Sequence, residues 1–514
     1  MLRNILSVGG LTLVSRILGF LRDILTAALL GAGPVADAFF VALRLPNHFR
    51  ALFAEGAFSS AFVPLFSATL VQDGREGAKR FAKEVQAVLL LVLGVLTIVF
   101  IVIMPWFMLV FAPGFADEPE KFDLAVLFTR ITFPYLLFMS LESLLAGVLN
   151  GVGRFAAAAA APILLNVCLI VAMVAAAPLM PTVGHALAVG VFVAGLVQYL
   201  YVAWDAGKVG MMLGLVRPRL TAGVRRFLKL MGPAALGSGL TQINLFVDTL
   251  IASLLPTGAV SYLYYADRLN QLPLGVIGIA IGTVLLPEMA RRIKGGDEAG
   301  AVESQNRAVE FTLVLTLPCA AAFLVSALPI LSVLFQHGRF GPTDAAQSAA
   351  TLQAYALGLP AFVVIRSLVS GFFARHDTAT PVRVAAVAML TNVALKVALM
   401  GPLAQVGLAV GTSVAAWVNA SLLAWLLHRR GLFAADARLK RALPRMAVAT
   451  VALGMALWLG QTALSPWLGA ADLPLRVAGL ALLVLLGVIV YGTLAVVLGM
   501  LRRSDLGRLR RRRA

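Results

Sequence analysis

The sequence predicts an all-α fold, a polytopic membrane protein with fourteen transmembrane helices, and three observations carry that prediction. Of its 514 residues, 60% are hydrophobic and only 13% are charged, which is more apolar material than a soluble protein of this size buries. The apolar residues form blocks of about twenty, the length that crosses a hydrocarbon core of about 30 Å. Basic residues gather in every second connection between these blocks.

Taken in order, fourteen apolar blocks are expected to be the membrane spans. The first block has no convincing small-residue cleavage site after it, and further spans follow, so we interpret it as a helix rather than a signal peptide. The connections are short, and no soluble domain is expected. The predicted spans are 5–31, 36–68, 84–112, 125–150, 157–178, 184–204, 225–254, 258–290, 306–336, 345–374, 382–400, 404–428, 444–464 and 474–500.

The distribution of charge orients the helices. Connections such as "DGREGAKRFAKE" and "HRRGLFAADARLKRALPR" are basic, whereas the alternate ones, such as "APGFADEPEKFD", are neutral or acidic. Because basic loops stay in the cytoplasm, both termini are predicted to be cytoplasmic and the number of spans to be even. The placement of the basic residues in alternate loops explains the net charge of +18, so no nucleic-acid partner is expected. The basic tail 502–514 is expected to meet anionic membrane lipids.

An internal repeat appears at an offset near 224 residues. The segment "FFVALRLPNHFRALFAEGAFSSAFVPLFS" resembles "LYYADRLNQLPLGVIGIAIGTVLLPEMA", so that Arg44 aligns with Arg268. Six helices separate the copies, and an even number preserves their orientation, so the repeats are parallel. The predicted parts are an N-lobe (1–210), a C-lobe (211–435), two extra helices (436–501) and the tail. Two six-helix lobes are the architecture of an alternating-access transporter.

The sequence contains no metal site, disulfide framework or catalytic group that we recognise. Its two cysteines lie in apolar blocks, and its five histidines lack ligand spacing. We therefore expect no metal, no cofactor and no enzymatic activity. His48 is the one histidine near a charged cluster, and an interfacial position is the simpler interpretation of it.

Charged residues inside the predicted spans are the strongest functional signal, because each is costly in hydrocarbon. Some of them are expected to pair across helices near a membrane face or to act in gating; these are Asp37, Arg44, Glu55 and Glu142, to which we add Pro46, Asn47 and Asp267 as structural or gating residues. Others outnumber the acids near them and predict an anionic ligand, since arginine suits bidentate contacts to phosphate or carboxylate. These are Arg16, Arg22, Arg50 and Arg268, with Asp23 beside them; Asp248, Arg366 and Lys396 are further span charges of the second half.

Several of these segments together resemble one family. "SRILGFLRD", "ADAFFVALRLPNHFRALFAEGAFSSAFVP", "VLNGVGRF", "YYADRL", "GTVLLPEMA" and "GFFARHDTATPV" are similar to motifs of the MurJ/MviN family, the lipid II flippases of the multidrug/oligosaccharidyl-lipid/polysaccharide exporter superfamily. The resemblance covers essentially the whole chain.

The resemblance implies a transporter in the bacterial inner membrane that moves lipid II, an undecaprenyl-diphosphate-linked precursor, to the periplasmic leaflet for peptidoglycan synthesis and cell shape. It implies a monomer that serves the cell-wall synthesis machinery. It places the family's cavity arginines on Arg16, Arg22, Arg50 and Arg268 here. It also implies that helices 13 and 14 form an apolar groove for the polyprenyl tail.

Two departures from the family pattern lead to separate predictions. Some relatives hold a cation in the second lobe, whereas here Lys396 follows Asn392 by one turn, at a position where an acid is wanted. An Asp248–Lys396 ion pair is therefore predicted in place of a bound cation, with the membrane potential as the driving force. Gln271 replaces an acid and is expected to leave Arg268 freer for ligand.

Three other functions stay open at this stage. A flippase for another polyprenyl-diphosphate oligosaccharide shares the phosphate chemistry. A drug exporter of the same superfamily would be expected to have acidic rather than arginine-lined lobes. A membrane glycosyltransferase or phosphatase would need acidic or histidine-bearing metal-binding loops. The resting conformation and the details of sugar and peptide recognition are not encoded in any pattern we recognise.

Overall fold

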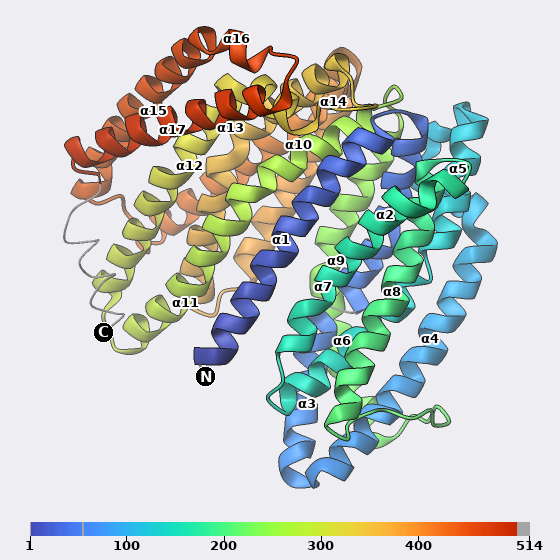
Figure 1. The fold of residues 1–514 in the computed structure, drawn as a ribbon. Coiled ribbons are helices and arrows are strands. Elements are labelled where there is room, and N and C mark those ends of the chain that lie inside the picture. The colour runs from blue at the N-terminus through green and yellow to red at the C-terminus, as the bar shows by residue number, and fades with distance from the viewer. Residues whose placement is uncertain (1, 54–55, 501–514) are drawn as a thin grey trace. The chain divides into compact units, whose positions relative to one another are not determined.

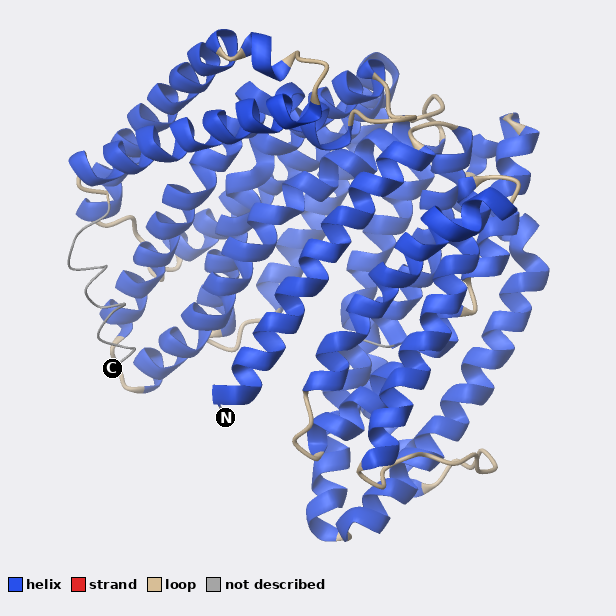
Figure 2. Ribbon diagram, viewed as in Figure 1, coloured by secondary structure: helices blue, strands red, loops and turns tan. Residues whose placement is uncertain are grey.

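The computed structural model describes residues 2–53 and 56–500, and in that part of the chain every regular element is a helix (Figure 1; Figure 2). The predicted all-α class is confirmed. Glu55 and the basic tail 502–514 fall outside the described residues. The helices are α1 (Leu2–Leu30), α2 (Pro34–Phe53), α3 (Gly56–Gln72), α4 (Gly74–Phe111), α5 (Pro119–Thr132), α6 (Tyr135–Gly151), α7 (Ala156–Val171), α8 (Val183–Lys208), α9 (Ala222–Ser253), α10 (Ala259–Pro273), α11 (Ile279–Lys294), α12 (Glu298–Phe335), α13 (Pro342–Phe373), α14 (Ala379–Arg429), α15 (Ala437–Ala463), α16 (Ser465–Leu468) and α17 (Leu473–Val497).

Ten helical stretches of the described chain are long and apolar enough to cross a membrane. One of them, α14, has 51 residues, about 76 Å of helix, and is too long for a single crossing. Its backbone breaks at Ala404, where φ is 46°. A Cβ placed on Gly411 would lie 3.3 Å from the backbone nitrogen of Lys396. The chain therefore folds back at Ala404, and α14 is a hairpin of two helices.

The remaining spans fit the sequence prediction. The α14 hairpin divides close to the predicted spans 382–400 and 404–428. Counting it twice, and adding α1, the α2–α3 pair and α9, is consistent with the fourteen spans expected. Charged residues interrupt the apolar sequences of α1 and α2, and several of the predicted site residues are among them.

The chain divides into two compact units, residues 1–261 with 337–340 and residues 262–336 with 341–514. In the first unit α9 packs on α2, α3 and α4. The units therefore part between Ser261 and Tyr262, inside α10, whereas the repeat places its boundary at 210/211. The lobes 1–210 and 211–435 are defined by sequence similarity and remain a prediction.

Stacked phenylalanines hold α9 to the first unit. The rings of Phe58 and Phe62 stack at 5.3 Å between centroids. Gly151 of α6 lets α3 approach closely, because a Cβ there would lie 2.7 Å from the Phe66 ring. All five rings are buried, so the cluster excludes lipid and fixes the positions of three helices. Its members are Phe58, Phe62 and Phe66 of α3, Phe81 of α4 and Phe227 of α9.

The two units contain matching ion pairs of opposite polarity. Arg154, after α6, donates to both carboxylate oxygens of Asp205 near the end of α8, at 2.6 and 3.1 Å. Asp377, after α13, accepts from Arg430 at the end of α14 at 2.7 Å. These positions lie within one residue of the 224-residue offset. In the first unit the pair joins the loop after α6 to the end of α8, and in the second it joins the loop after α13 to the end of α14.

The Asp377 carboxylate also caps α14. It accepts from the hydroxyl and the backbone N–H of Thr380 at 2.6 and 2.9 Å. Together with Arg430, these bonds lower the pKa of Asp377 to about 2. Because the pKa of Asp377 is lower in the folded chain than in the unfolded one, its carboxylate stabilises the fold above about pH 4. That stabilisation is lost as the pH falls towards 2.

Exchanging the charges should test the first pair. Arg154→Asp should destabilise the protein by about 1 kcal/mol, because the mostly buried Asp205 side chain (11% exposed) would then face a second carboxylate. The double variant Arg154→Asp/Asp205→Arg should recover most of that loss. Thermal unfolding of the purified protein measures both. Equal stability of the single and double variants would mean that the pair contributes nothing.

Candidate functional site

Arg22 of α1 is held in a fixed orientation by two partners. It donates to Asp23 through Nη2 at 2.7 Å and through Nε at 3.2 Å. Its Nη1 donates to Oδ1 of Asn166 on α7 at 2.9 Å. The Asn166 amide in turn donates to the carbonyls of Ser15 and Pro162. A ligand would therefore meet a pre-oriented arginine that is already balanced by one carboxylate, rather than a bare cation.

The other first-unit arginines differ in environment. Arg16, on α1, is exposed. Arg50 is half-buried near the end of α2 and donates to Asn47 at 3.2 Å. Arg44 lies on the same helix, 3.4 Å from the Thr249 hydroxyl of α9. The predicted anion-binding and gating arginines of helices 1 and 2 thus lie in one compact unit, and polar side chains contact three of them.

Pro46 interrupts the backbone hydrogen bonds of α2, and neighbouring side chains donate to the carbonyls affected. Because proline lacks an N–H, the carbonyl of Ala42 has no helical donor. The buried Thr132 hydroxyl of α5 donates to that carbonyl at 3.3 Å. The Asn47 amide donates to the next carbonyl, that of Leu43, at 2.9 Å. Pro46 and Asn47 therefore have a structural role in α2, beside Arg50.

Asp37, at the start of α2, is fully buried and accepts from the beginning of α10. Its oxygens accept from the N–H of Gly258 at 2.7 Å and from the N–H and hydroxyl of Ser261 at 2.9 and 2.6 Å. The ammonium of Lys121 on α5, also buried, lies 3.6 Å away. Hydrogen bonds from a helix N-terminus stabilise a carboxylate well. Asp37 therefore joins α2, α5 and the start of α10.

Lys121 is a residue that the sequence analysis missed. It also contacts Glu118 at 3.3 Å and the Thr257 hydroxyl at 2.9 Å, and it lies over the Phe115 ring. The Thr257 hydroxyl donates to Glu118, and this bond holds the pKa of Glu118 below its usual value. In the sequence Lys121 stands among acids in an apparently solvated loop, so only the folded chain reveals that it is buried.

In the second unit, Arg268 packs against an aromatic ring. Its guanidinium lies 4.6 Å from the Tyr264 ring centroid, and Nη2 donates to the Tyr264 hydroxyl at 3.0 Å. The neighbouring Asp267 accepts from Gln271. Gln271 is thus engaged with Asp267 one turn away, and the ring and hydroxyl of Tyr264 help to position Arg268.

Arg366 of α13, expected as a span charge but not assigned to the anion site, is a further candidate. Its side chain is exposed on a spanning helix, and in the described part of the chain no carboxylate pairs with it. It lies against Gly278, where a Cβ would come within 3.0 Å of Nε. Gly278 ends a π-helical turn, Leu274–Gly278, a distortion that is frequent at functional sites. Arg366 is one of the charges expected inside the spans, but its neighbour Gly278 cannot be identified from the sequence alone.

The residues of the predicted ion pair fall in different units. Asp248 is on α9 in the first unit, while Asn392 and Lys396 are on α14 in the second. Lys396 and Asn392 are both buried. Gly411, across the α14 hairpin, makes room for the Lys396 stem, because a Cβ there would lie 3.1 Å from its Cγ. The Asp248–Lys396 pair remains a prediction.

His48 is a packing residue. Its Nδ1 lies 3.2 Å from Oε1 of Gln242, and its ring meets Phe111 edge-on at 6.1 Å. These contacts give His48 a packing role, and the interfacial position expected of it stays a prediction.

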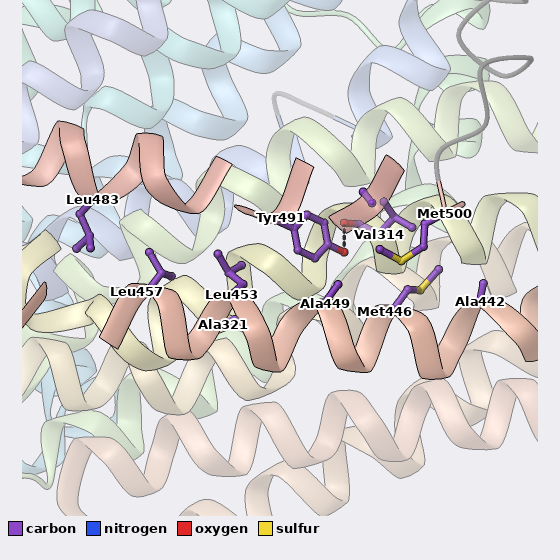
Figure 3. Close-up of a cluster of buried hydrophobic side chains, with 11 residues drawn as sticks. Val314, Ala321, Ala442, Met446, Ala449, Leu453, Leu457, Leu483, Tyr491 and Met500 are labelled. Atoms are coloured by element: carbon purple, nitrogen blue, oxygen red, sulfur yellow. Dashed lines mark hydrogen bonds between the residues drawn. The ribbon is translucent and has the colours of Figure 1, made fainter. Parts of the chain in front are cut away.

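An apolar cavity of about 400 Å³ lies between α12, α15 and α17. Figure 3 shows Leu453 and Leu457 of α15 beside Leu483 and Tyr491 of α17. The Tyr491 hydroxyl donates to the Val314 carbonyl of α12 at 2.9 Å, so the ring presents only its apolar face to the cavity. Cys319 of α12 also lines it. Such a space suits a hydrocarbon chain.

Comparison with known proteins points to one family. The family model described as Lipid II flippase MurJ matches residues 26–479. A probable lipid II flippase MurJ of Rhizobium meliloti (strain 1021) is 47% identical over 515 residues, covering 98% of this chain and 96% of the relative. A probable lipid II flippase MurJ of Haemophilus influenzae is 37% identical over 505 residues, covering 95% and 98%.

Solved structures support the fold. A structure of a lipid II flippase MurJ in an inward closed conformation has a TM-score of 0.79 at 24% identity, covering 95% of this chain and 98% of that one. An inward-facing multidrug resistance transporter of the MATE family has a TM-score of 0.68 at 16% identity, covering 83% and 96%. The second likeness shows that this helical architecture also serves drug export, so the fold alone does not select a substrate.

Proposed function

Since this chain belongs to the MurJ lipid II flippase family, a family of multi-pass membrane transporters, we propose that it moves lipid II from the cytoplasmic to the periplasmic leaflet of the inner membrane. The transport makes and breaks no covalent bond. We further propose that both termini are cytoplasmic, that the basic tail contacts anionic lipid, and that the protein acts as a monomer supplying the cell-wall synthesis machinery.

The oriented guanidinium of Arg22 is the observation that carries the proposal for the headgroup. A diphosphate offers several anionic oxygens, and arginine binds such groups through paired N–H donors. Asp23 and Asn166 hold Arg22 at 2.7 and 2.9 Å, so little side-chain entropy is lost on binding. We assign Arg16, Arg50 and Arg268 to the same headgroup, as the family resemblance implies, and add Arg366.

Alternating access supplies the movement in this proposal. Neutralising the arginine charge by a diphosphate is proposed to favour the rocking of the two predicted lobes that exposes the headgroup to the periplasm. Asp37 and its partners hold the start of α10 to the first unit, although most of α10 belongs to the second. We propose that this network is one element of the gate. The polyprenyl tail stays in apolar surroundings throughout.

Transport of lipid II by the purified protein tests the function. In proteoliposomes that contain fluorescent lipid II, the label should become accessible to a membrane-impermeant quencher of the opposite leaflet at a rate proportional to protein content. A matched lipid without the diphosphate should not be moved. The proposal fails if both lipids, or neither, change leaflet with protein present.

The two superfamily alternatives are separated by competition. Another polyprenyl-diphosphate saccharide has the same phosphate and tail chemistry and differs only in sugar and peptide. If such a lipid competes with lipid II as well as unlabelled lipid II does, the site recognises only the shared part. Lipophilic cations should not compete, because the candidate residues are arginines.

We propose that the cavity between α12, α15 and α17 binds the polyprenyl tail. Gly492 lines it, and no atom lies within 4 Å of a Cβ built there. Gly492→Trp should therefore fill the cavity without a backbone clash and slow lipid II transport by about tenfold. Gly94→Trp on α4, another open glycine, is the matched control and should not change the rate. If both or neither slow transport, the cavity does not hold the tail.

Lys396 is proposed to replace a coupled cation. A buried ammonium that pairs with Asp248 would leave no charge for sodium to balance. Lipid II transport in proteoliposomes should therefore be equal in sodium and potassium media, and should rise with an inside-negative potential. A sodium gradient that drives transport would contradict this assignment.

A further inference from the structure

The connection between α8 and α9, residues 209–221, presents apolar side chains to the outside. It contains no helix or strand. Met211 and Leu213 point inward and are 1% and 7% exposed, whereas Leu215 and Leu220 are 82% and 58% exposed. Two large leucines are left without protein neighbours to cover them.

The exposure of the 209–221 loop is built into the fold, because both of its ends are fixed to α4. Arg75 Nη2 donates to the Val209 carbonyl at 2.6 Å, and Lys79 Nζ donates to the Gly210 carbonyl at 2.7 Å. At the other end the Thr221 hydroxyl donates to Glu84 at 2.8 Å. In Figure 1 this green loop extends sideways beyond the end of α8. The middle of the loop is therefore held out from the bundle.

The charges of the loop complement an anionic surface. Arg217 and Arg219 lie between Leu215 and Leu220, both are exposed, and the segment 209–221 contains no acidic residue. Exposed basic residues of α9 follow directly, among them Arg225 and Arg226. Cations interleaved with apolar side chains match phosphate headgroups lying over hydrocarbon.

Position along the spanning helix also favours lipid over a protein partner. The loop begins where α8, a membrane-spanning helix, ends. One turn earlier Trp204 is 61% exposed, and the Lys208 ammonium lies 3.2 Å from its ring centroid. Exposed tryptophan with a neighbouring lysine is typical of the membrane–water boundary. The leucines of the loop are therefore presented at the depth of the headgroups.

We propose that the 209–221 loop is an interfacial anchor that binds anionic phospholipid. Leu215 and Leu220 insert among the upper acyl carbons, and Arg217 and Arg219 bind the phosphates of anionic headgroups. This anchor stands apart from the arginines assigned to the transported headgroup, and it would exist whatever that substrate is.

An environment-sensitive dye tests the anchor. The chain has two cysteines, Cys168 and Cys319, so Leu215→Cys in a Cys168→Ala/Cys319→Ala background carries one label. In nanodiscs that contain phosphatidylglycerol, its emission should shift to the blue and be quenched by brominated acyl chains. In phosphatidylcholine alone, quenching should fall by about half or more. Ala299→Cys, exposed at the start of α12, is the matched control and should stay water-like in both lipids.

The arginines are tested in the same background. Arg217→Gln/Arg219→Gln should remove the difference between the two lipids. Several outcomes would overturn the proposal: a water-like Leu215 label in both lipids, equal quenching in both with no effect of the arginine substitutions, or protection that arises only when membrane proteins from a cell extract are added. Size-exclusion chromatography of each labelled protein checks that it is folded.

Discussion

Asp37→Ala should lower the free energy of unfolding by about 3–5 kcal/mol, the largest stability effect expected of a single substitution here. Removing the carboxylate takes away the buried partner of the Lys121 ammonium at 3.6 Å and leaves it with Glu118, a half-exposed side chain at 3.3 Å. It also leaves the N–H groups of Gly258 and Ser261 without an acceptor. Thermal unfolding followed by circular dichroism measures the loss. Asp123→Ala, an exposed acid on α5, is the control.

Neutral replacements of Asp37 and Lys121 should separate the contribution of the ion pair to stability from that of the hydrogen bonds. Asp37→Asn keeps an oxygen for Ser261 but removes one of the two carboxylates near the Lys121 ammonium, so it should be nearly as destabilising as the alanine variant. Asp37→Asn/Lys121→Met removes both charges and should recover more than half of the lost stability, since uncharged replacements of buried pairs are often tolerated. If the double variant is less stable than Asp37→Asn, the ion pair is not the source of the effect.

Arg22→Ala and Arg268→Ala should each reduce the rate of lipid II transport by about ten- to a hundredfold. A hydrogen bond to a charged group is worth about 1.5–3 kcal/mol, and each arginine can offer two. Growth of cells depleted of their own flippase should fail with either variant at matched expression. Arg383→Ala, an exposed arginine at the start of α14, is the control and should support growth.

Conservative variants sharpen this second test. Arg22→Lys keeps the charge but loses the fork that contacts Asp23 and Asn166 together, so its transport should stay low. Tyr264→Phe keeps the ring beneath Arg268 but removes the hydroxyl acceptor, and should cost less than Arg268→Ala. Near-normal transport by both alanine variants would mean that these arginines do not bind the headgroup, and Arg366 would then become the first residue to test.

The contacts of Arg22 and Asp37 would respond differently to a movement between the two predicted lobes. Arg22 joins α1 to α7, and Asp37 joins α2 to α5 and the start of α10, both inside the first unit. Movement of one unit relative to the other does not require the Arg22 contacts to break. It does require α10 either to bend or to leave Asp37, because α10 continues into the second unit.

The sequence alone was sufficient for the class of the fold and for the candidate arginines. Apolar blocks about 30 Å long have no stable place in water, and a charge within such a block is costly enough to imply a function. These are properties of composition and spacing, so they do not depend on how the helices pack. The same reasoning separated the α14 hairpin into two spans, because a crossing has a fixed length.

Tertiary structure decided which charges have protein partners. Asn166, which accepts from Arg22, is distant from it in sequence. Lys121 appeared to be a solvated loop residue but is buried beside Asp37. The contact of Arg366 with Gly278 is visible only in the folded chain. Helix packing also places α9 in the first unit, through rings that the repeat does not predict. Hydrophobic periodicity identifies which face of a helix is buried, but it does not identify the helix that packs against that face. Whether a buried charge is neutralised depends on the side chains of that second helix.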